Sequence, residues 1–310
     1  MGGRVHTVCM PELPEVEALA ADLGERLMGR AIRRVDVTEI AALKTYDPSV
    51  DALHGTTFTG TGRRGKHLVL SVDSGLHLVI HLARSGWIRW REASPRPTAG
   101  RGRGPLAARV MLEPPEAAEQ TGAELGGDGF DVTEQATHKR LAIHVVQHPD
   151  RVMSIATLGP EPLETGFTEE RFAAVLAHAG RAQIKGVLRD QRRIAGIGNA
   201  YSDEILHAAR MSPFHPASMP PDDVARLYAA LRQVLTEAVE RAMGVPAASL
   251  KAEKRQGMRV HGRKGEACPV CGDTVRQVIY ADSTFEYCAT CQTGGKPLAD
   301  RVLSRLGVRR

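Results

Sequence analysis

Two CxxC knuckles stand near the end of this chain, Cys268-Pro-Val-Cys271 and Cys288-Ala-Thr-Cys291. Sixteen residues separate them, which is enough for a hairpin, so both knuckles can surround one tetrahedral ion. Four thiolates leave no open position for water, and the pattern therefore predicts one structural Zn2+ ion rather than a catalytic one. A pair of disulfides is the alternative, and it requires an oxidising compartment.

Basic side chains flank the two knuckles. They are Arg259, Arg263 and Lys264 before the first knuckle, and Lys296 and Arg301 after the second. The formal net charge of +5 and the isoelectric point near 9.1 favour an anionic partner, although many basic proteins bind no nucleic acid. We expect a zinc ribbon over residues 255–294 and a basic tail over residues 295–310.

The length and composition are those of a globular protein. A chain of 310 residues suits about two domains. Its 42% hydrophobic and 25% charged residues are ordinary, and no apolar run reaches transmembrane length. Residues 1–9 lack the apolar core of a signal peptide. We therefore expect a cytoplasmic, nucleoid-associated protein with no membrane partner, in a compartment that keeps thiols reduced.

The pattern of apolar residues changes along the chain. The first half favours strands over residues 66–72, 76–82, 109–112, 130–133 and 140–146, with a helix over 15–27. The second half favours helices over residues 169–178, 184–190, 201–209 and 221–243. These changes predict an N-terminal domain over 10–148, a linker over 149–166 and a helical domain over 167–250.

Two short motifs outside the ribbon suggest chemistry. The turn Gly196-Ile-Gly-Asn-Ala-Tyr201 lies between two predicted helices, and Asn199 is placed to cap the second. Free N–H groups at a helix start bind phosphate, but such a turn is more often only a cap. The stretch Met10-Pro-Glu-Leu-Pro-Glu-Val-Glu17 is by itself an acidic helix start.

These elements occur in a fixed order: the octapeptide, a strand-borne Gly65-Lys66, the Gly-Ile-Gly-Asn turn and the two knuckles. In this respect the chain resembles the formamidopyrimidine-DNA glycosylase/endonuclease VIII family, from Met10 to about Gln292. The resemblance implies an α+β fold: an N-terminal β-sandwich with flanking helices, then a C-terminal helix–two-turns–helix domain and a zinc ribbon.

The resemblance also implies a set of catalytic residues. Removal of the initiator methionine makes Pro11 the N-terminal nucleophile, whose secondary amine attacks C1′ of the sugar and forms an iminium ion. Glu12 matches the family's catalytic acid, Lys66 its catalytic lysine, and Glu15 supports the site. The iminium acidifies the C2′ proton, so β- or β,δ-elimination then cuts the strand.

DNA-binding positions carry over in the same way. Asn199 matches the family's phosphate-binding asparagine, and Arg181 and Lys185 match basic positions around the preceding helix. Arg84 replaces the methionine of a family motif whose side chain fills the gap left by the flipped base. Arg140 lies in Thr137-His-Lys-Arg-Leu141, which stands where purine-excising members carry a phenylalanine wedge.

Departures from the family pattern indicate its branch. The phenylalanine wedge is missing, the segment Leu250 to Gly262 is short, and Asp282 replaces an arginine expected in the ribbon. The last change removes a phosphate contact and weakens the case for efficient δ-elimination. Together these departures favour an endonuclease VIII-like enzyme acting on oxidised pyrimidines or on single-stranded lesions.

The first nine residues conflict with this chemistry. If translation starts at Met1, Pro11 is an internal amide without a nucleophilic nitrogen. A start at Met10 restores the family geometry, and we expect residues 1–9 to be an extension that is not translated.

We therefore predict a base-excision-repair DNA glycosylase with AP lyase activity. It is expected to bind damaged DNA, duplex or single-stranded, as a monomer. A non-catalytic DNA-damage-binding protein on the same scaffold is the first alternative. A zinc-ribbon RNA-binding or ribosome-associated protein is the second, and Pro11, Glu12 and Lys66 occurring together argue against it.

Overall fold

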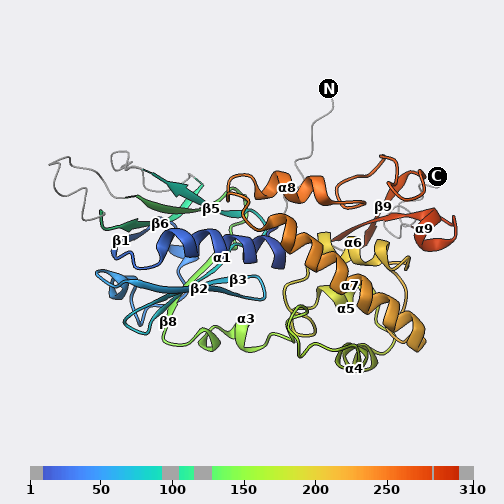
Figure 1. The fold of residues 1–310 in the computed structure, drawn as a ribbon, viewed down its shortest axis with the longest axis horizontal. Coiled ribbons are helices and arrows are strands. Elements are labelled where there is room, and N and C mark those ends of the chain that lie inside the picture. The colour runs from blue at the N-terminus through green and yellow to red at the C-terminus, as the bar shows by residue number, and fades with distance from the viewer. Residues whose placement is uncertain (1–9, 93–104, 115–127, 281–282, 300–310) are drawn as a thin grey trace. The chain divides into compact units, whose positions relative to one another are not determined.

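The computed structural model describes residues 10–92, 105–114, 128–280 and 283–299 (Figure 1). The expected extension over residues 1–9, most of the expected basic tail, and Asp282 lie outside these ranges. The chain forms two compact units. The first runs to Ala156 and takes in Ala242–Lys251, and the second holds Thr157–Arg241 and the chain from Ala252 onward.

The first unit contains one long helix and two antiparallel sheets (Figure 1). One sheet has the strand order β1-β6-β7-β5 and the other β2-β3-β4-β8. The elements are α1 (Leu13–Leu27), β1 (Ile32–Val37), η1 (Ile40–Ala42), η2 (Val50–Leu53), β2 (Phe58–Arg64), β3 (His67–Val72), β4 (His77–His81), β5 (Gly86–Arg91), β6 (Leu106–Leu112), β7 (Gly129–Glu134), β8 (Ala142–Val146), η3 (Pro149–Arg151) and α3 (Met153–Ala156). Both sheets and α1 contribute to one hydrophobic core.

Helix α1 begins two residues before the expected Glu15. Glu12 is its N-cap and forms a capping box with Glu15, and Pro14 sits in the first turn, where its missing N–H costs nothing. Val16, Leu19, Leu23 and Leu27 recur at helical spacing and are fully buried. The burial of this apolar stripe fixes the helix start against the first unit's core.

The hairpin of β2 and β3 corrects one expectation. Gly65 and Lys66 are not borne on a strand, because β2 ends at Arg64 and β3 begins at His67. They form the intervening turn, and Gly65 adopts φ 57°, a left-handed conformation that glycine accepts without strain.

A late segment completes the first unit. Ala242, Ala247 and Leu250 join its hydrophobic core. The indole N–H of Trp87 on β5 donates a buried hydrogen bond of 2.9 Å to the carbonyl of Ala247. The helical domain expected over residues 167–250 therefore ends with a stretch that packs in the other unit.

The second unit is helical with a β-ribbon. Its elements are α4 (Glu169–Ala179), α5 (Ile184–Arg189), α6 (Asn199–Ala208), α7 (Pro221–Ala242), α8 (Leu250–Gly257), β9 (Val275–Tyr280), β10 (Ser283–Cys288) and α9 (Ala289–Thr293), of which α7 and α8 each run across a boundary between the units. Helices α5 and α6 are separated by two successive turns, and β9 pairs with β10 in an antiparallel hairpin. The expected α+β fold is confirmed, with N-terminal sheets, a helix–two-turns–helix unit and a cysteine-bearing ribbon.

Among the residues that the structure describes, no helix is both long enough and apolar enough to cross a bilayer.

Candidate functional site

The start of α1 gathers the acidic residues expected in the active site. Glu12 and Glu15 are each 1% exposed, and Pro11 directly before them is also buried. The backbone N–H of Glu12 donates to Glu15 Oε2 at 2.8 Å, and the Glu12 carboxylate accepts from the backbone N–H of Glu15. These reciprocal bonds hold both carboxylates and place the backbone of Pro11 at a fixed position before the helix.

Lys66 lies in the turn between β2 and β3 and is 8% exposed. Arg63 connects this turn to α1. Its Nη1 donates to the carbonyl of Gly65 at 2.9 Å, and its Nε donates to Glu17 Oε2 at 2.8 Å. The structure thus ties the turn that bears Lys66 to the helix that begins after Pro11.

Buried histidines that no sequence motif marked adjoin Lys66. His67 opens β3 and is paired in register with His81 on β4, with ring centroids 4.7 Å apart. Burial lowers the pKa of His67 to about 4 and that of His81 to about 3, and the nearby charges of Lys66 and His144 act in the same direction. Both rings are therefore neutral at pH 7. The signal was available, because the hairpin around Asp73-Ser-Gly75 places the two histidines opposite each other.

Arg84 and Arg140 are both exposed, each in a connection between strands. Arg84 lies in the tight turn between β4 and β5. Arg140 lies in the loop before β8, where the buried carboxylate of Glu134 accepts from the backbone N–H groups of Arg140 and Leu141 at 2.9 and 3.1 Å. Glu134, which no sequence motif marked, therefore holds the loop, while the Arg140 side chain stays exposed.

The second unit places Asn199 at the first position of α6. The N-cap is Gly198, so the expectation that the Asn199 side chain caps this helix is wrong. Its Oδ1 is buried and has no hydrogen-bond partner. Gln191 holds the preceding turn, since its side chain accepts from the Gly196 N–H at 2.9 Å and donates to the Ile197 carbonyl at 2.6 Å.

The two basic residues expected near Asn199 differ in exposure. Arg181 is exposed in the loop between α4 and α5. Lys185 is fully buried, forms an ion pair with Asp203, and donates to the carbonyl of Asn199 at 3.3 Å. Its ammonium also lies 4.7 Å from the ring centroid of Phe285. Lys185 therefore does not present its charge at the surface, and its link to Asn199 runs through the backbone.

One face of α6 holds the ribbon through buried polar groups. The carboxylate of Glu204 accepts from three consecutive backbone N–H groups, those of residues 259–261, at 2.8 to 2.9 Å. Asp203 lies 2.9 Å from Nδ1 of His261. One turn further along, His207 places Nε2 3.3 Å from Sγ of Cys268. The helix that begins at Asn199 is thereby bonded to the chain around the first knuckle.

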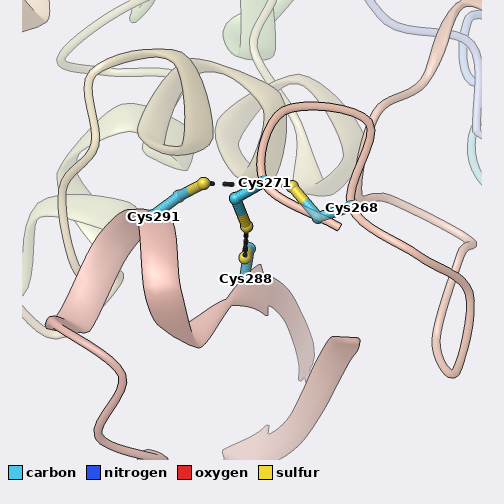
Figure 2. Close-up of side chains that lie close together, drawn as sticks. All are labelled: Cys268, Cys271, Cys288 and Cys291. Atoms are coloured by element: carbon cyan, nitrogen blue, oxygen red, sulfur yellow. Dashed lines mark hydrogen bonds between the residues drawn. The ribbon is translucent and has the colours of Figure 1, made fainter. Parts of the chain in front are cut away.

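The four cysteines converge as the spacing predicted (Figure 2). All four sulfur atoms lie within 4.8 Å of one another. Cys268 and Cys291 are 3.9 Å apart and Cys271 and Cys288 are 3.3 Å apart, so the thiols are free rather than joined as disulfides. A tetrahedral ion with bonds of about 2.3 Å sets its sulfur ligands roughly 3.8 Å apart, and the cluster fits such an ion.

Comparison with known proteins agrees with this arrangement. Residues 10–119 match the family model of the formamidopyrimidine-DNA glycosylase N-terminal domain, and residues 158–248 match that of its H2TH domain. A Mycobacterium tuberculosis protein described as an uncharacterized formamidopyrimidine-DNA glycosylase-like protein is 54% identical over 150 residues, covering 48% of this chain and 93% of that one. A formamidopyrimidine-DNA glycosylase of Symbiobacterium thermophilum is 35% identical over 296 residues, covering 91% of this chain and 89% of its own.

Solved structures agree as well. The crystal structure of the MutM (Fpg) protein of Thermus thermophilus is 31% identical, with a TM-score of 0.74 over 93% of this chain and 100% of that one. A Lactococcus lactis Fpg solved as a complex with abasic-site DNA has a TM-score of 0.75 over 91% of this chain and 99% of its own, and at 22% identity it shows the fold alone. The chain belongs to the formamidopyrimidine-DNA glycosylase family.

Proposed function

We propose that this protein is a base-excision-repair DNA glycosylase with AP lyase activity. The observation that carries the proposal is the buried start of α1, where Pro11 stands directly before the Glu12–Glu15 capping box and Arg63 links this helix to the Lys66 turn. Relatives that cover nine-tenths of the chain bear the name formamidopyrimidine-DNA glycosylase, which supports the same activity.

The proposed nucleophile is the amine of Pro11 in a chain that begins at that residue. A terminal amine titrates at roughly pH 8, so a useful fraction is neutral near pH 7. Its nitrogen forms a bond to C1′ as the bond from C1′ to the damaged base breaks. The nitrogen then loses its proton, and cleavage of the bond from C1′ to the ring oxygen gives an iminium ion. The match to the family's N-terminal domain begins at residue 10, which supports a mature chain starting at Pro11.

Glu12 and Lys66 are the proposed proton carriers. Glu12 passes a proton to the sugar ring while the ring opens, and its burial in the capping box keeps the carboxyl at one position beside Pro11. Lys66 donates a proton to the departing group and contacts a phosphate. Glu15 supports Glu12 through the reciprocal hydrogen bond.

The second unit supplies the proposed phosphate contacts. Asn199 binds a phosphate at the start of α6, where the helix presents its free N–H groups. Arg181 adds an exposed charge. Lys185 acts indirectly, because its ammonium bonds the carbonyl of Asn199. One Zn2+ ion held by the four cysteines keeps the ribbon folded.

Oxidised pyrimidines, in duplex or single-stranded DNA, are the proposed substrates, as in the endonuclease VIII-like branch. Arg84 and Arg140 are exposed in the two connections where purine-excising members carry methionine and phenylalanine wedges, and a guanidinium group stacks on bases. The chain between Leu250 and Gly262 is also short, being largely occupied by α8.

Borohydride trapping tests the proposal. A chain that begins at Pro11 is expected to form a covalent complex with abasic DNA and with thymine glycol, and to process 8-oxoguanine more slowly. A chain fixed to begin at Met1 is the matched control. It keeps every phosphate-contacting residue, so it should bind DNA equally well, but an amide nitrogen cannot form an iminium.

Two results decide between the alternatives. Binding to damaged DNA without trapping by either chain would favour the non-catalytic damage-binding protein. Equal trapping by both chains, with mass spectrometry showing residues 1–9 still attached, would remove Pro11 as the nucleophile. Faster excision of 8-oxoguanine than of thymine glycol would contradict the assignment to the pyrimidine branch.

A further inference from the structure

The turn that carries Lys66 is held from two sides by side chains that have no part in the chemistry described above. Lys66 follows Arg64 and Gly65, and the carbonyls of both preceding residues accept a side-chain hydrogen bond. A turn that contains glycine is otherwise free to adopt several conformations. Fixing these two carbonyls fixes both peptide planes that lead into Lys66.

Arg63 forms the first of these contacts. Its side chain is only 9% exposed, and the guanidinium donates to the carbonyl of Gly65 at 2.9 Å and to Glu17 at 2.8 Å. The bond to the Glu17 carboxylate is charge-assisted, which makes it short and strong. Arg63 therefore fastens the Gly65–Lys66 peptide to the first turns of α1.

His67 forms the second contact. A carbonyl only accepts, so Nδ1 of His67 must carry the proton that bonds the carbonyl of Arg64 at 3.1 Å. In the neutral ring Nε2 is then the acceptor, and it takes the hydroxyl proton of Ser154 at 2.9 Å. His67 therefore fastens the Arg64–Gly65 peptide to α3.

We propose that Arg63 and His67 are positioning residues that hold Lys66 for the reaction. This inference rests on the proposed catalytic role of Lys66. Neither residue needs to touch DNA, because each acts on the backbone immediately before the lysine. A displacement of about 1 Å at a reacting group can cost roughly 100-fold in rate, so loosening this turn should slow the chemical step more than it weakens binding.

Two substitutions of His67 separate its contacts. The amide of asparagine can replace Nδ1, so His67→Asn keeps the bond to Arg64 and loses the bond to Ser154. The longer glutamine can replace Nε2, so His67→Gln keeps Ser154 and loses Arg64. Arg63→Gln removes the charge-assisted bond to Glu17, and Arg63→Lys keeps the charge without the fork that reaches both partners.

The chain offers a matched control on the same hairpin. His77 opens β4, and its Nδ1 lies 2.9 Å from the hydroxyl of Ser71, a histidine–serine bond of the same length as that of His67. His77→Gln replaces Nε2 rather than Nδ1, so it breaks an equivalent bond away from the Lys66 turn. General loosening of the sheet should therefore appear in this variant too.

Three measurements on each full-length variant complete the test: the single-turnover excision rate, the DNA affinity, and the rate at which an amine-reactive ester acylates Lys66. We expect Arg63→Gln and His67→Gln to lose roughly 10- to 100-fold in rate, with affinity nearly unchanged. Lys66 should be acylated several-fold faster in both. His67→Asn and Arg63→Lys should keep more of the rate than these two variants, and His77→Gln should match the unsubstituted chain.

The acylation rate keeps this inference separable from the proposed function. If the unsubstituted chain excises no base, the proposed function fails, while faster acylation of Lys66 in Arg63→Gln and His67→Gln still supports a positioned lysine. Unchanged acylation in both variants overturns the inference, as does an equal rise in His77→Gln. Loss of DNA affinity in proportion to rate would also overturn it.

Discussion

Asn199 buries a side-chain oxygen that has no hydrogen-bond partner, at the first position of an α-helix. Burying a polar atom without a partner is costly, so proteins seldom do it without a reason such as strain or a ligand site. A phosphate accepts hydrogen bonds, so the groups of this site suited to bind one are the side-chain N–H donors of Asn199 and the N–H groups at the start of α6. If both residues bind phosphate as proposed, the neutral amide of Asn199 and the exposed charge of Arg181 form two kinds of contact that salt can tell apart.

We expect Asn199→Ala and Arg181→Ala to weaken binding to all DNA sequences by similar factors. Arg181→Ala should also lower the slope of log affinity against log salt by about one, because one fewer counterion is released. Asn199→Ala should leave the slope unchanged. Titrations over a series of salt concentrations measure both quantities. Arg226, whose charge is paired with Asp223 at 2.7 Å, supplies the control Arg226→Ala. A base preference altered by either test variant would place that residue in direct base readout instead.

Lys185 shows why the surroundings of a residue were harder to predict than its match to a family position. A lysine at a helix start after a basic loop suggests a surface contact, and nothing local argues otherwise. Its burial is determined by Asp203, eighteen positions later, and by Phe285 from the ribbon. Pairings at such separations cannot be seen in one sequence, whereas the cysteine cluster could be, because knuckle spacing itself encodes the geometry.

Helix α6 connects the proposed phosphate site to the four-cysteine cluster within ten residues. It begins at Asn199, and its buried polar residues reach the ribbon through Glu204 and His207. Since hydrogen bonds to a metal's ligands commonly change metal affinity, His207 should affect how firmly the ribbon keeps its ion.

The expected result of His207→Ala is metal release to a chelator about 10- to 100-fold faster than from the unsubstituted chain. His207→Gln restores a donor near Nε2 and should recover part of the retention. His178→Gln, an exposed histidine on α4, serves as the control. Cys268→Ser should lose the ion altogether. If His207→Ala holds its metal as tightly as the control, the contact with Cys268 is only one of packing.

Elements with a regular apolar pattern were predicted closely. The strand expected over 66–72 is β3 (His67–Val72), and the helix expected over 221–243 is α7 (Pro221–Ala242). Strand β2 was not predicted, since Phe58–Arg64 alternates glycine and threonine rather than apolar and polar residues. Its strand character comes from pairing with β3 and packing beside α1, neither of which is local.

The first unit's stability should depend on pH through its buried histidines. The pKa values of His67 and His81 are lowered from 6.5 to about 4 and about 3, chiefly by burial, with Lys66 and His144 nearby. The unfolded chain therefore binds more protons below pH 6.5. Their contribution is complete above pH 6.5 and is lost as the pH falls toward 4 and 3, by at most about 1.4 kcal/mol per pH unit for each ring.

Urea unfolding at pH 7, 5.5 and 4.5 measures this loss. His67→Asn should flatten the profile relative to the unsubstituted chain, whereas substitution of exposed His178 should not. A free energy of unfolding that stays constant between pH 7 and 4.5 would show that both rings find a proton acceptor in the folded protein.

The order of the domains followed from the change in apolar pattern, but the return of residues 242–251 to the first unit did not. Nothing in the composition of Met243-Gly-Val-Pro-Ala247 marks it as part of a β-rich core. This segment is joined to the first unit by contacts that are distant in sequence, such as the hydrogen bond from the Trp87 indole N–H to the carbonyl of Ala247.

That return has a consequence for synthesis on the ribosome. The chain emerges from its N-terminal end, so both sheets and α1 leave the exit tunnel well before residues 242–251 do. Until then the indole of Trp87 lacks its acceptor, and the core lacks Ala242, Ala247 and Leu250. The core of the nascent first unit therefore stays incomplete while the intervening helices are translated. It is completed only after residues 242–251 have emerged, when the helices of the second unit that precede them have already been made.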